Sequence, residues 1–363
     1  MKVFTPKDTK IKDIVRNVDD NIIQGLVQSC LKIKKDDEYA KIYSAFYNTK
    51  YPFKDLSVSE QRLEEYIKQM SAEPSSAMRT KLQGKEYRWV IIDEENLGAT
   101  AFRYYFAPNP SNMHEIVKNL TAQLSAKKIP VKFKYQLKDK MNECDRIILY
   151  SDFEHQQNIE QVIHSVYQQH PNLFNGSERP LSWIYTSNTP NIYLAPETPG
   201  SSYGEEFART MIEAKEIFCY LYGITDTNNR INLNGEAAKN ALDYMELIVS
   251  SLMLRRGLLL SKDNKRIVFK DKIKSSYDYK TGKLTSCCDD SYGHHSVVYS
   301  QDADGKNALL NSFYEISQMQ PQQGVEVEHL TQQERRRKLY ETFGWYADEF
   351  KNTTSKNPRR YRR

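Results

Sequence analysis

The sequence of 363 residues contains no apolar run close to the roughly 20 residues that a membrane-spanning helix requires. Its first residues, Met1 to Pro6, do not lead into a hydrophobic signal region. The sequence also lacks a glycine-rich loop of the Walker or dinucleotide-binding type, which argues against a kinase. We therefore expect a soluble protein with no membrane partner and no cofactor. Export by a secretion system that reads a polar, unprocessed N-terminus stays open.

Cysteine is too scarce and too irregularly spaced for a disulfide framework or a zinc site. The five cysteines, an odd number without metal-ligand spacing, are Cys30, Cys144, Cys219, Cys287 and Cys288. We therefore expect free thiols in a reducing compartment. His294 and His295 could join the last two cysteines around zinc, but adjacent pairs do not give the usual ligand spacing, so no metal site is expected.

The charge is nearly balanced, which argues against a protein dedicated to nucleic acid. Lys and Arg number 52 and Asp and Glu number 47, and the net charge is +5. Most of the excess lies near the end of the chain, in Glu334–Lys338 and Asn357–Arg363. A solvated basic tail explains it, because the stacking aromatic residues of a nucleic-acid binder are missing. We expect no nucleic-acid partner.

The first part of the chain predicts a helical lobe. Apolar residues recur at helical spacing over residues 11–70 and indicate two or three helices. Ser57–Glu60 has the spacing of a capping box, and the small polar stretch Ser71–Ala77 is typical of a linker. We therefore place a helical N-terminal lobe at residues 1–75.

The centre of the chain predicts an α+β core over residues 76–262. β-branched and aromatic residues indicate strands at 89–92, 99–106, 129–137 and 146–150. Helical spacing indicates helices from a cap at Ser111 to Lys128, over 159–166 and over 236–260. This order is typical of an α+β fold with a central mixed or antiparallel sheet flanked by helices. In residues 263–363 we expect a polar loop over 275–305, a C-terminal helix and the basic tail.

The stretch Tyr193–Arg209 has features of an anion site. Its two prolines predict a rigid loop, Ser201 or Ser202 can cap the helix that follows, and Gly223 supplies the stop. The N–H groups of the first helical turn, together with Arg209, would attract a phosphate or carboxylate. A capped helix after such a loop is also common in proteins without any ligand there.

Two predicted strands carry basic residues among apolar ones. Strand alternation puts Arg103 and Tyr105 on one face of their strand, and Lys132 and Lys134 on one face of theirs. Beside the helix start at Ser202, these four would form a concentrated anion site. A one-sided sheet with a solvated polar face explains the same residues more simply.

These segments resemble the HopA-type effector family in order and spacing. The similar segments, within a resemblance from Glu38 to Gly223, are 102–106, 129–134, 145–150 and 201–209. The family contains type III secreted effectors of plant-pathogenic bacteria, and related proteins in class V lanthipeptide gene clusters are thought to act as phosphoserine/phosphothreonine lyases. The sequence departs from the family at Val131, where the family has Phe, and at Glu143, where it has Arg, so a cationic contact of the family is either missing here or supplied by Arg146.

The resemblance implies a cofactor-free lyase that eliminates phosphate from phosphoserine or phosphothreonine in a peptide or protein. Such a reaction needs a base for the Cα proton, cations for the phosphate and a proton donor to the leaving oxygen. Lys134 matches the family lysine and is the expected base. The expected phosphate-binding residues are Arg103, Lys132, Arg146, Ser202 and Arg209. The expected donors are His114, Tyr105 and Tyr203.

The alternative is a secreted effector that binds a phosphoprotein or a chaperone without chemistry. The expected partners are a phosphorylated peptide or protein and, in the bacterium, a secretion chaperone or a kinase. The protein would act in the bacterial cytoplasm or, after passage through a type III or similar system, in a host cell.

Overall fold

The computed structural model describes residues 20–34, 37–47, 57–72, 77–84, 86–137, 145–175, 180, 182, 185–198, 201–224, 235–260, 272–290 and 293–318. Contacts divide these residues into two compact units. The large-sheet unit is built mainly from residues 43–204, and the small-sheet unit from 23–42 and the described residues after 204. The predicted domains, with boundaries at 75/76 and 262/263, stay a prediction. A unit with dense internal contacts is not necessarily a domain that folds independently.

The large-sheet unit contains a seven-stranded sheet in the order β1-β2-β4-β5-β3-β7-β6. Every strand pair in it is antiparallel. The strands are β1 (Met78–Gln83), β2 (Tyr87–Ile92), β3 (Phe102–Phe106), β4 (Val131–Gln136), β5 (Ile147–Ser151), β6 (Tyr185–Thr186) and β7 (Ile192–Pro196). The structure thus confirms the predicted α+β class and the strands predicted in the centre of the chain.

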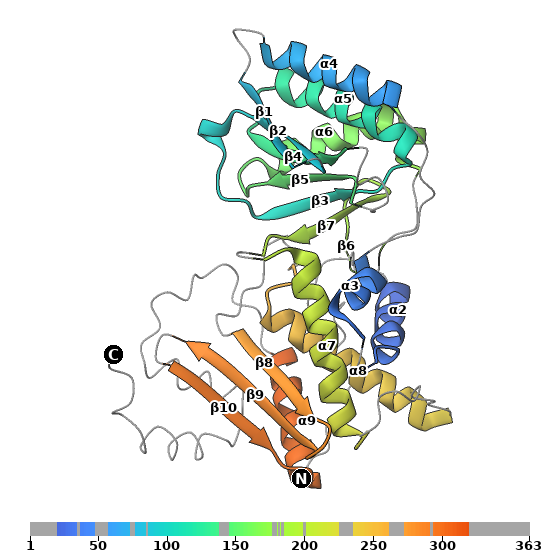
Figure 1. The fold of residues 1–363 in the computed structure, drawn as a ribbon, viewed down its shortest axis with the longest axis vertical. Coiled ribbons are helices and arrows are strands. Elements are labelled where there is room, and N and C mark those ends of the chain that lie inside the picture. The colour runs from blue at the N-terminus through green and yellow to red at the C-terminus, as the bar shows by residue number, and fades with distance from the viewer. Residues whose placement is uncertain are drawn as a thin grey trace. The chain divides into compact units, whose positions relative to one another are not determined.

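Helices cover one face of this sheet (Figure 1). They are α4 (Ser57–Ala72), α5 (Pro110–Ala126) and α6 (Gln156–Gln169), with short 3-10 turns at Glu94–Asn96 and Pro171–Phe174. The hydroxyl of Tyr135 on β4 donates to Glu64 on α4, and that of Tyr104 on β3 donates to Glu160 on α6, both at 2.9 Å. Since α5 packs against α4 and α6, all three helices belong to this layer.

The small-sheet unit combines long helices with a three-stranded antiparallel sheet in the order β10-β9-β8. Its elements are α2 (Asp20–Leu31), α7 (Tyr203–Leu221), α8 (Gly235–Arg255), β8 (Lys272–Asp278), β9 (Lys283–Asp290), β10 (Gly293–Tyr299) and α9 (Ala303–Gln318). Between the units, the chain runs through α3 (Tyr39–Tyr47) and through the first turn of α7. Among the helices described, none is long and apolar enough to cross a membrane.

The prediction of a polar loop over 275–305 is wrong, because β8, β9 and β10 occupy most of that region. Tyr277, Leu284, Val297 and Tyr299 are buried, and exposed residues alternate with them. A sheet that buries one face needs an apolar residue only at every second position. The small number of apolar residues in this region is therefore explained by a sheet that buries only one face.

Two local predictions also need correction. The stretch that begins at Tyr193 starts as strand β7 rather than as a loop, and Pro196 is tolerated there because it is the last residue of the strand. Helix α5 is capped by Asn109, whose side chain accepts a hydrogen bond from the Ser111 N–H at 3.2 Å, and Ser111 is not the cap. The predicted end of α7 is confirmed, since Gly223 follows it with φ of 63°.

Candidate functional site

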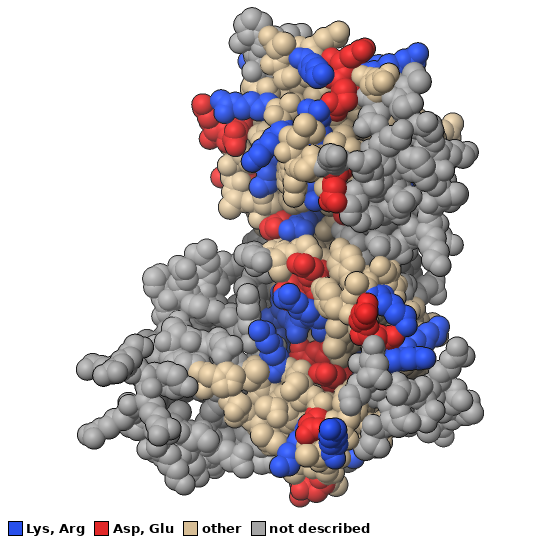
Figure 2. Space-filling model, viewed as in Figure 1, with Lys and Arg blue, Asp and Glu red and all other residues tan. Residues whose placement is uncertain are grey.

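Three basic side chains lie on the face of the large sheet that α4, α5 and α6 leave uncovered. In the register of the strands, Arg103 and Lys132 both lie opposite Tyr150, one on each side of β5, and Lys134 lies opposite Ile148. Directly opposed residues of antiparallel strands point to the same side of a sheet. This confirms the predicted alternation, and we call this surface the cationic face. Figure 2 shows basic side chains, with acidic ones among them, over the region where Figure 1 draws this sheet.

The Tyr150 ring is the centre of the cationic face. The guanidinium carbon of Arg103 lies 5.3 Å from the ring centroid, and the ammonium nitrogen of Lys132 lies 5.6 Å from it. Burial raises the pKa of Tyr150, and the charge of Arg103 cancels only part of this rise. The Tyr150 hydroxyl therefore keeps its proton at neutral pH. Two cations beside one ring repel each other, and a bound anion would relieve this repulsion.

Arg103 is held in place by Glu197, the first residue after β7. Its Nε and Nη2 atoms donate to the two carboxylate oxygens, each at 2.5 Å. Burial lowers the pKa of Arg103, but the bond to Glu197 and the neighbouring tyrosines raise it by more, so the net shift is upward. The guanidinium is therefore a fixed, permanently charged group, and Glu197 is a positioning residue that the sequence did not reveal.

Lys134 lies against aromatic rings on the same face. Its ammonium nitrogen is 4.1 Å from the centroid of Tyr87 and 5.8 Å from that of Trp89. The Trp89 ring stacks on Tyr150 with a centroid separation of 5.2 Å. The aromatic surface is thus continuous from Lys134 to Tyr150. Stacked rings of this kind stabilise the ammonium ion and shield the space around it from water.

Tyr105 and Tyr203 extend the cationic face toward the start of α7. Their rings are 6.4 Å apart. Burial raises the pKa of Tyr105 and the charge of Arg103 lowers it, and the net result is a pKa of about 12. The Tyr203 hydroxyl donates to the backbone oxygen of Ser182 at 3.1 Å, so its proton already has an acceptor within the fold. Of these two tyrosines, Tyr105 is the one whose charge interacts with Arg103.

His114 does not join the cationic face. It is buried in α5, within the helical layer on the other side of the sheet. Burial lowers the pKa of His114 to about 4, so the imidazole is neutral at physiological pH. A neutral histidine on the opposite face has no path to a phosphate held near Tyr150. The structure therefore does not bring His114 together with the other predicted residues.

Arg146 lies at the buried end of the cationic face. It directly precedes β5, its backbone oxygen accepts a hydrogen bond from the Gln136 N–H at 2.9 Å, and its side chain is fully buried. The side-chain amide of Gln136 donates to Asp145 at 3.1 Å. Alternation puts Arg146 on the side of Ile148 and Tyr150. Its predicted part in phosphate binding stays a prediction.

The residues predicted around the start of α7 are divided between the two units. Ser202 directly precedes α7 and so occupies the cap position of that helix, as the sequence predicts. Arg209 belongs to the small-sheet unit, where its side chain is 55% exposed and contacts Glu206 at 3.2 Å. That Ser202 and Arg209 complete a phosphate site with Arg103 stays a prediction.

The central part of the chain is similar to a known protein family. Residues 77–185 match the sequence model of the HopA1 effector protein family. This confirms the family resemblance for the segment from β1 to the first residue of β6, which carries the basic residues of the cationic face. Among the curated proteins, none matches the chain.

Two solved structures of Pseudomonas syringae effector proteins are also similar. The effector protein from pathovar tomato strain DC3000 has a TM-score of 0.47 and 11% identity, over 67% of this chain and 95% of its own. The effector protein from pathovar syringae strain 61 has a TM-score of 0.42 and 13% identity, over 68% of this chain and 98% of its own.

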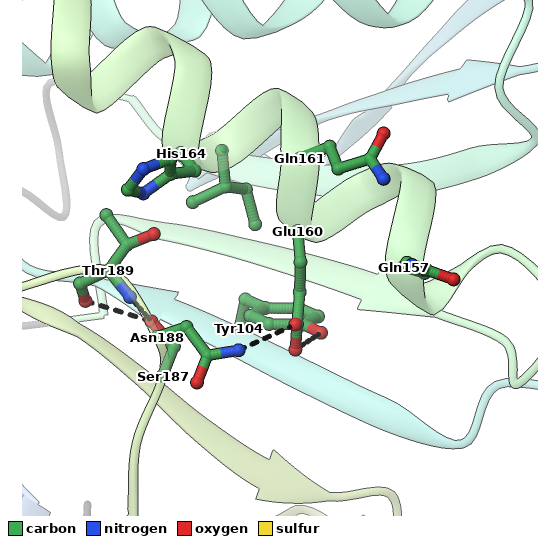
Figure 3. A pocket seen from close by; sticks show the side chains of 9 residues that line it. Tyr104, Gln157, Glu160, Gln161, His164, Ser187, Asn188 and Thr189 are labelled. Carbon is green, nitrogen blue, oxygen red and sulfur yellow. Dashed lines mark hydrogen bonds between the residues drawn. The ribbon is translucent and has the colours of Figure 1, made fainter.

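A pocket of about 340 Å³ lies on the other face of the HopA1-like segment, between α6 and the turn after β6 (Figure 3). The Glu160 carboxylate accepts hydrogen bonds there from Tyr104, Asn188 and Gln156. The hydrogen bonds of the Glu160 carboxylate are thus provided within the fold. The sheet lies between this pocket and the cationic face. Among the described residues, no group of three or more His, Cys, Asp or Glu could hold a metal ion.

Proposed function

We propose that the protein is a HopA1-like effector that binds a phosphorylated serine or threonine side chain at the cationic face and eliminates its phosphate. The observation that carries this proposal is the approach of Arg103 and Lys132 to the two sides of the Tyr150 ring. Arg103 forms an ion pair with Glu197, whereas no described carboxylate forms one with Lys132. A phosphate dianion would balance the remaining positive charge and accept hydrogen bonds from both cations.

The same face has the groups that a β-elimination requires. The lysine amine accepts the Cα proton, the electrons of the C–H bond form the Cα–Cβ double bond, and the Cβ–O bond breaks to release phosphate. Lys134, in its unprotonated form, is the base; Arg103 and Lys132 bind the leaving phosphate; and the neutral phenol of Tyr105 donates to its bridging oxygen. The reaction transfers no electrons to an external acceptor.

A mass-spectrometric assay tests this proposal. A phosphothreonine peptide incubated with the protein should yield a product about 98 Da lighter, the mass of phosphoric acid. Lys134→Met should abolish the product and leave peptide binding within about threefold, whereas Lys132→Met should weaken binding. Lys118→Met, on the helical side of the sheet, is the matched control and should convert the peptide as the wild type does. An intact peptide at every pH from 6 to 9 would exclude the lyase.

A second function, phosphopeptide binding without chemistry, is favoured by one observation. Lys134 lies over two aromatic rings, and this contact stabilises an ammonium ion rather than the free amine that a base requires. In this case the peptide binds to the wild type and is recovered unchanged. The same assay separates the two functions, because mass loss occurs only with the lyase.

We infer that the protein acts inside a host cell after secretion through a type III or similar system, since its central segment matches a family of effectors. A secretion chaperone would be its partner in the bacterium. A fusion to a reporter enzyme that works only in host cytoplasm tests this inference. Signal that depends on an intact secretion system is expected, and signal that persists without that system would contradict delivery.

A further inference from the structure

We propose that the cationic face has a second anion subsite at Lys81, which binds the carboxylate of a glutamate or aspartate that accompanies the phosphorylated residue of the peptide. Lys81 lies on β1, at the edge of the seven-stranded sheet (Figure 1). The proposal rests on the function proposed above and names the class of its substrate, an acidic phosphopeptide.

The register of the strands puts alternate side chains of β1 on the cationic face. Lys81 lies opposite Trp89 on β2, and Trp89 lies opposite Lys134 on β4. Directly opposed residues of antiparallel strands point to the same side of a sheet. Met78, an odd number of positions from Lys81, is buried on the other side, where α4 packs against β1. The cationic face therefore continues from β4 to the edge of the sheet.

The Trp89 ring has a lysine on each of its two sides. Lys81 and Lys134 lie opposite Trp89 in the register, one on each side of β2. Two basic residues flank Tyr150 in the same way, and the rings of Trp89 and Tyr150 stack on each other. The indole Nε1 donates to Oε1 of Gln83 on β1 at 2.7 Å, so β1 holds the orientation of the ring. A fixed aromatic surface thus joins the two pairs of basic residues.

Lys81 differs from the other basic residue of β1 in its contacts. Arg79 points to the same face but contacts Glu94 at 3.5 Å, so a carboxylate already balances its charge. Lys81 is exposed, and no carboxylate of the described residues forms an ion pair with it. Its ammonium can donate hydrogen bonds to a carboxylate of the ligand. A carboxylate matches this single charge, whereas the phosphate dianion is matched by the two cations beside Tyr150.

The distance between the two subsites suits a peptide. Neighbouring strands are about 4.8 Å apart, so the three spacings from β5 to β1 amount to about 14 Å. An extended peptide advances about 3.3 Å per residue and covers this distance in about four residues. With its phosphate at Tyr150, the peptide would place a side chain three to five positions away near Lys81. Only one direction of the peptide brings that side chain to β1.

Anisotropy titrations of the full chain with three fluorescent phosphothreonine peptides, at fixed ionic strength, test the proposal. The first peptide has glutamate three, four and five positions before the phosphothreonine and glutamine at the same positions after it. The second has the reverse arrangement, and the third has glutamine at all six positions. One of the two acidic peptides should bind about fivefold more tightly than the third. Equal affinity of the two acidic peptides, which have the same net charge, would overturn the proposal.

Two variants with the same loss of charge complete the experiment. In Lys81→Met the fivefold preference for the acidic peptide should fall to about one. Lys127→Met, altered at the exposed C-terminal cap of α5, should keep it. Each preference is a ratio of two affinities of one variant, so a partial loss of folded protein does not change it.

The two possible failures are distinguishable. If the wild type binds the third peptide no more tightly than its unphosphorylated form, the phosphate site is overturned, and this proposal with it. If the wild type prefers the phosphorylated form but Lys81→Met keeps the preference for the acidic peptide, only the subsite at Lys81 is overturned.

Discussion

The direction of a single guanidinium decides the geometry of the cationic face. Arg103 could approach the Tyr150 ring in several rotamers, and the two bonds to Glu197 select one of them. A planar guanidinium that is held by a carboxylate on one edge presents its remaining N–H groups in a fixed direction. Glu197 therefore sets where an anion would be bound, although it carries the same sign of charge as that anion.

The first prediction concerns this pair. Glu197→Gln should lower the free energy of unfolding by about 2 kcal/mol, because a partly buried guanidinium loses a charged, two-point partner. Denaturant titration measures the change. In a double-mutant cycle with Arg103→Met, the two substitutions should show a coupling energy above about 1 kcal/mol. A coupling energy near zero would mean that the pair does not position Arg103.

A second prediction at the residue scale concerns the pH dependence of stability. The pKa of Glu216 is raised from 4.5 to about 7 in the folded chain. Between these values the native state binds more protons at this group than the unfolded state, so its contribution to stability falls as the pH rises. Glu216→Gln should therefore gain stability relative to the wild type at pH 8 compared with pH 5. A difference in unfolding free energy that is equal at both pH values would contradict the raised pKa.

Strand alternation predicted which side of each strand a functional residue occupies, whereas the grouping of residues from different strands was a hypothesis that no local pattern supports. Alternation alone put Arg103 with Tyr105 and Lys132 with Lys134, and the structure agrees. Arg103 and Lys132 lie beside the same Tyr150 ring because β5 lies between β3 and β4 in the sheet. Strand order is set by long-range packing, which leaves no local pattern in the sequence. The side of the sheet on which α5 packs, and with it His114, likewise leaves no local pattern in the sequence.

At the scale of secondary structure, the predictions succeeded where the apolar pattern is strong on both sides of an element. Strands β3, β4 and β5 lie in the middle of the sheet and are buried. Strand β1 lies at the sheet edge with mostly exposed residues and has too weak a pattern to predict. Strands β8 to β10 were missed because a three-stranded, one-sided sheet needs few apolar residues.

A third prediction distinguishes the observed cap of α5 from the expected one. Asn109→Ala removes the side chain that accepts the Ser111 N–H and should lower the free energy of unfolding by about 1 kcal/mol. Ser111→Ala keeps that N–H and should cost less than about half as much. Thermal or denaturant unfolding of both variants measures the difference. A larger loss of stability in Ser111→Ala than in Asn109→Ala would indicate that Ser111 is the cap.

At the scale of the whole molecule, the two units carry different chemistry. The large-sheet unit has the HopA1-like segment and the cationic face. The small-sheet unit has a pocket of about 480 Å³ along α7 that both glutamates and basic side chains line. The pocket along α7 could not be predicted from the sequence, because its glutamates are typical of an exposed helix face until β8 and the end of α8 are placed against them.

The most direct test of the account is the affinity of the full chain for a fluorescent phosphothreonine peptide, measured by anisotropy at fixed ionic strength. The double variant Lys132→Met/Lys134→Met should bind at least about tenfold more weakly than the wild type, and the unphosphorylated peptide should bind as weakly as the variant does. The charge-matched control Lys118→Met/Lys127→Met, altered on α5 and at its C-terminal cap, should bind as the wild type does. Equal affinity of the two double variants would contradict a phosphate site on the cationic face.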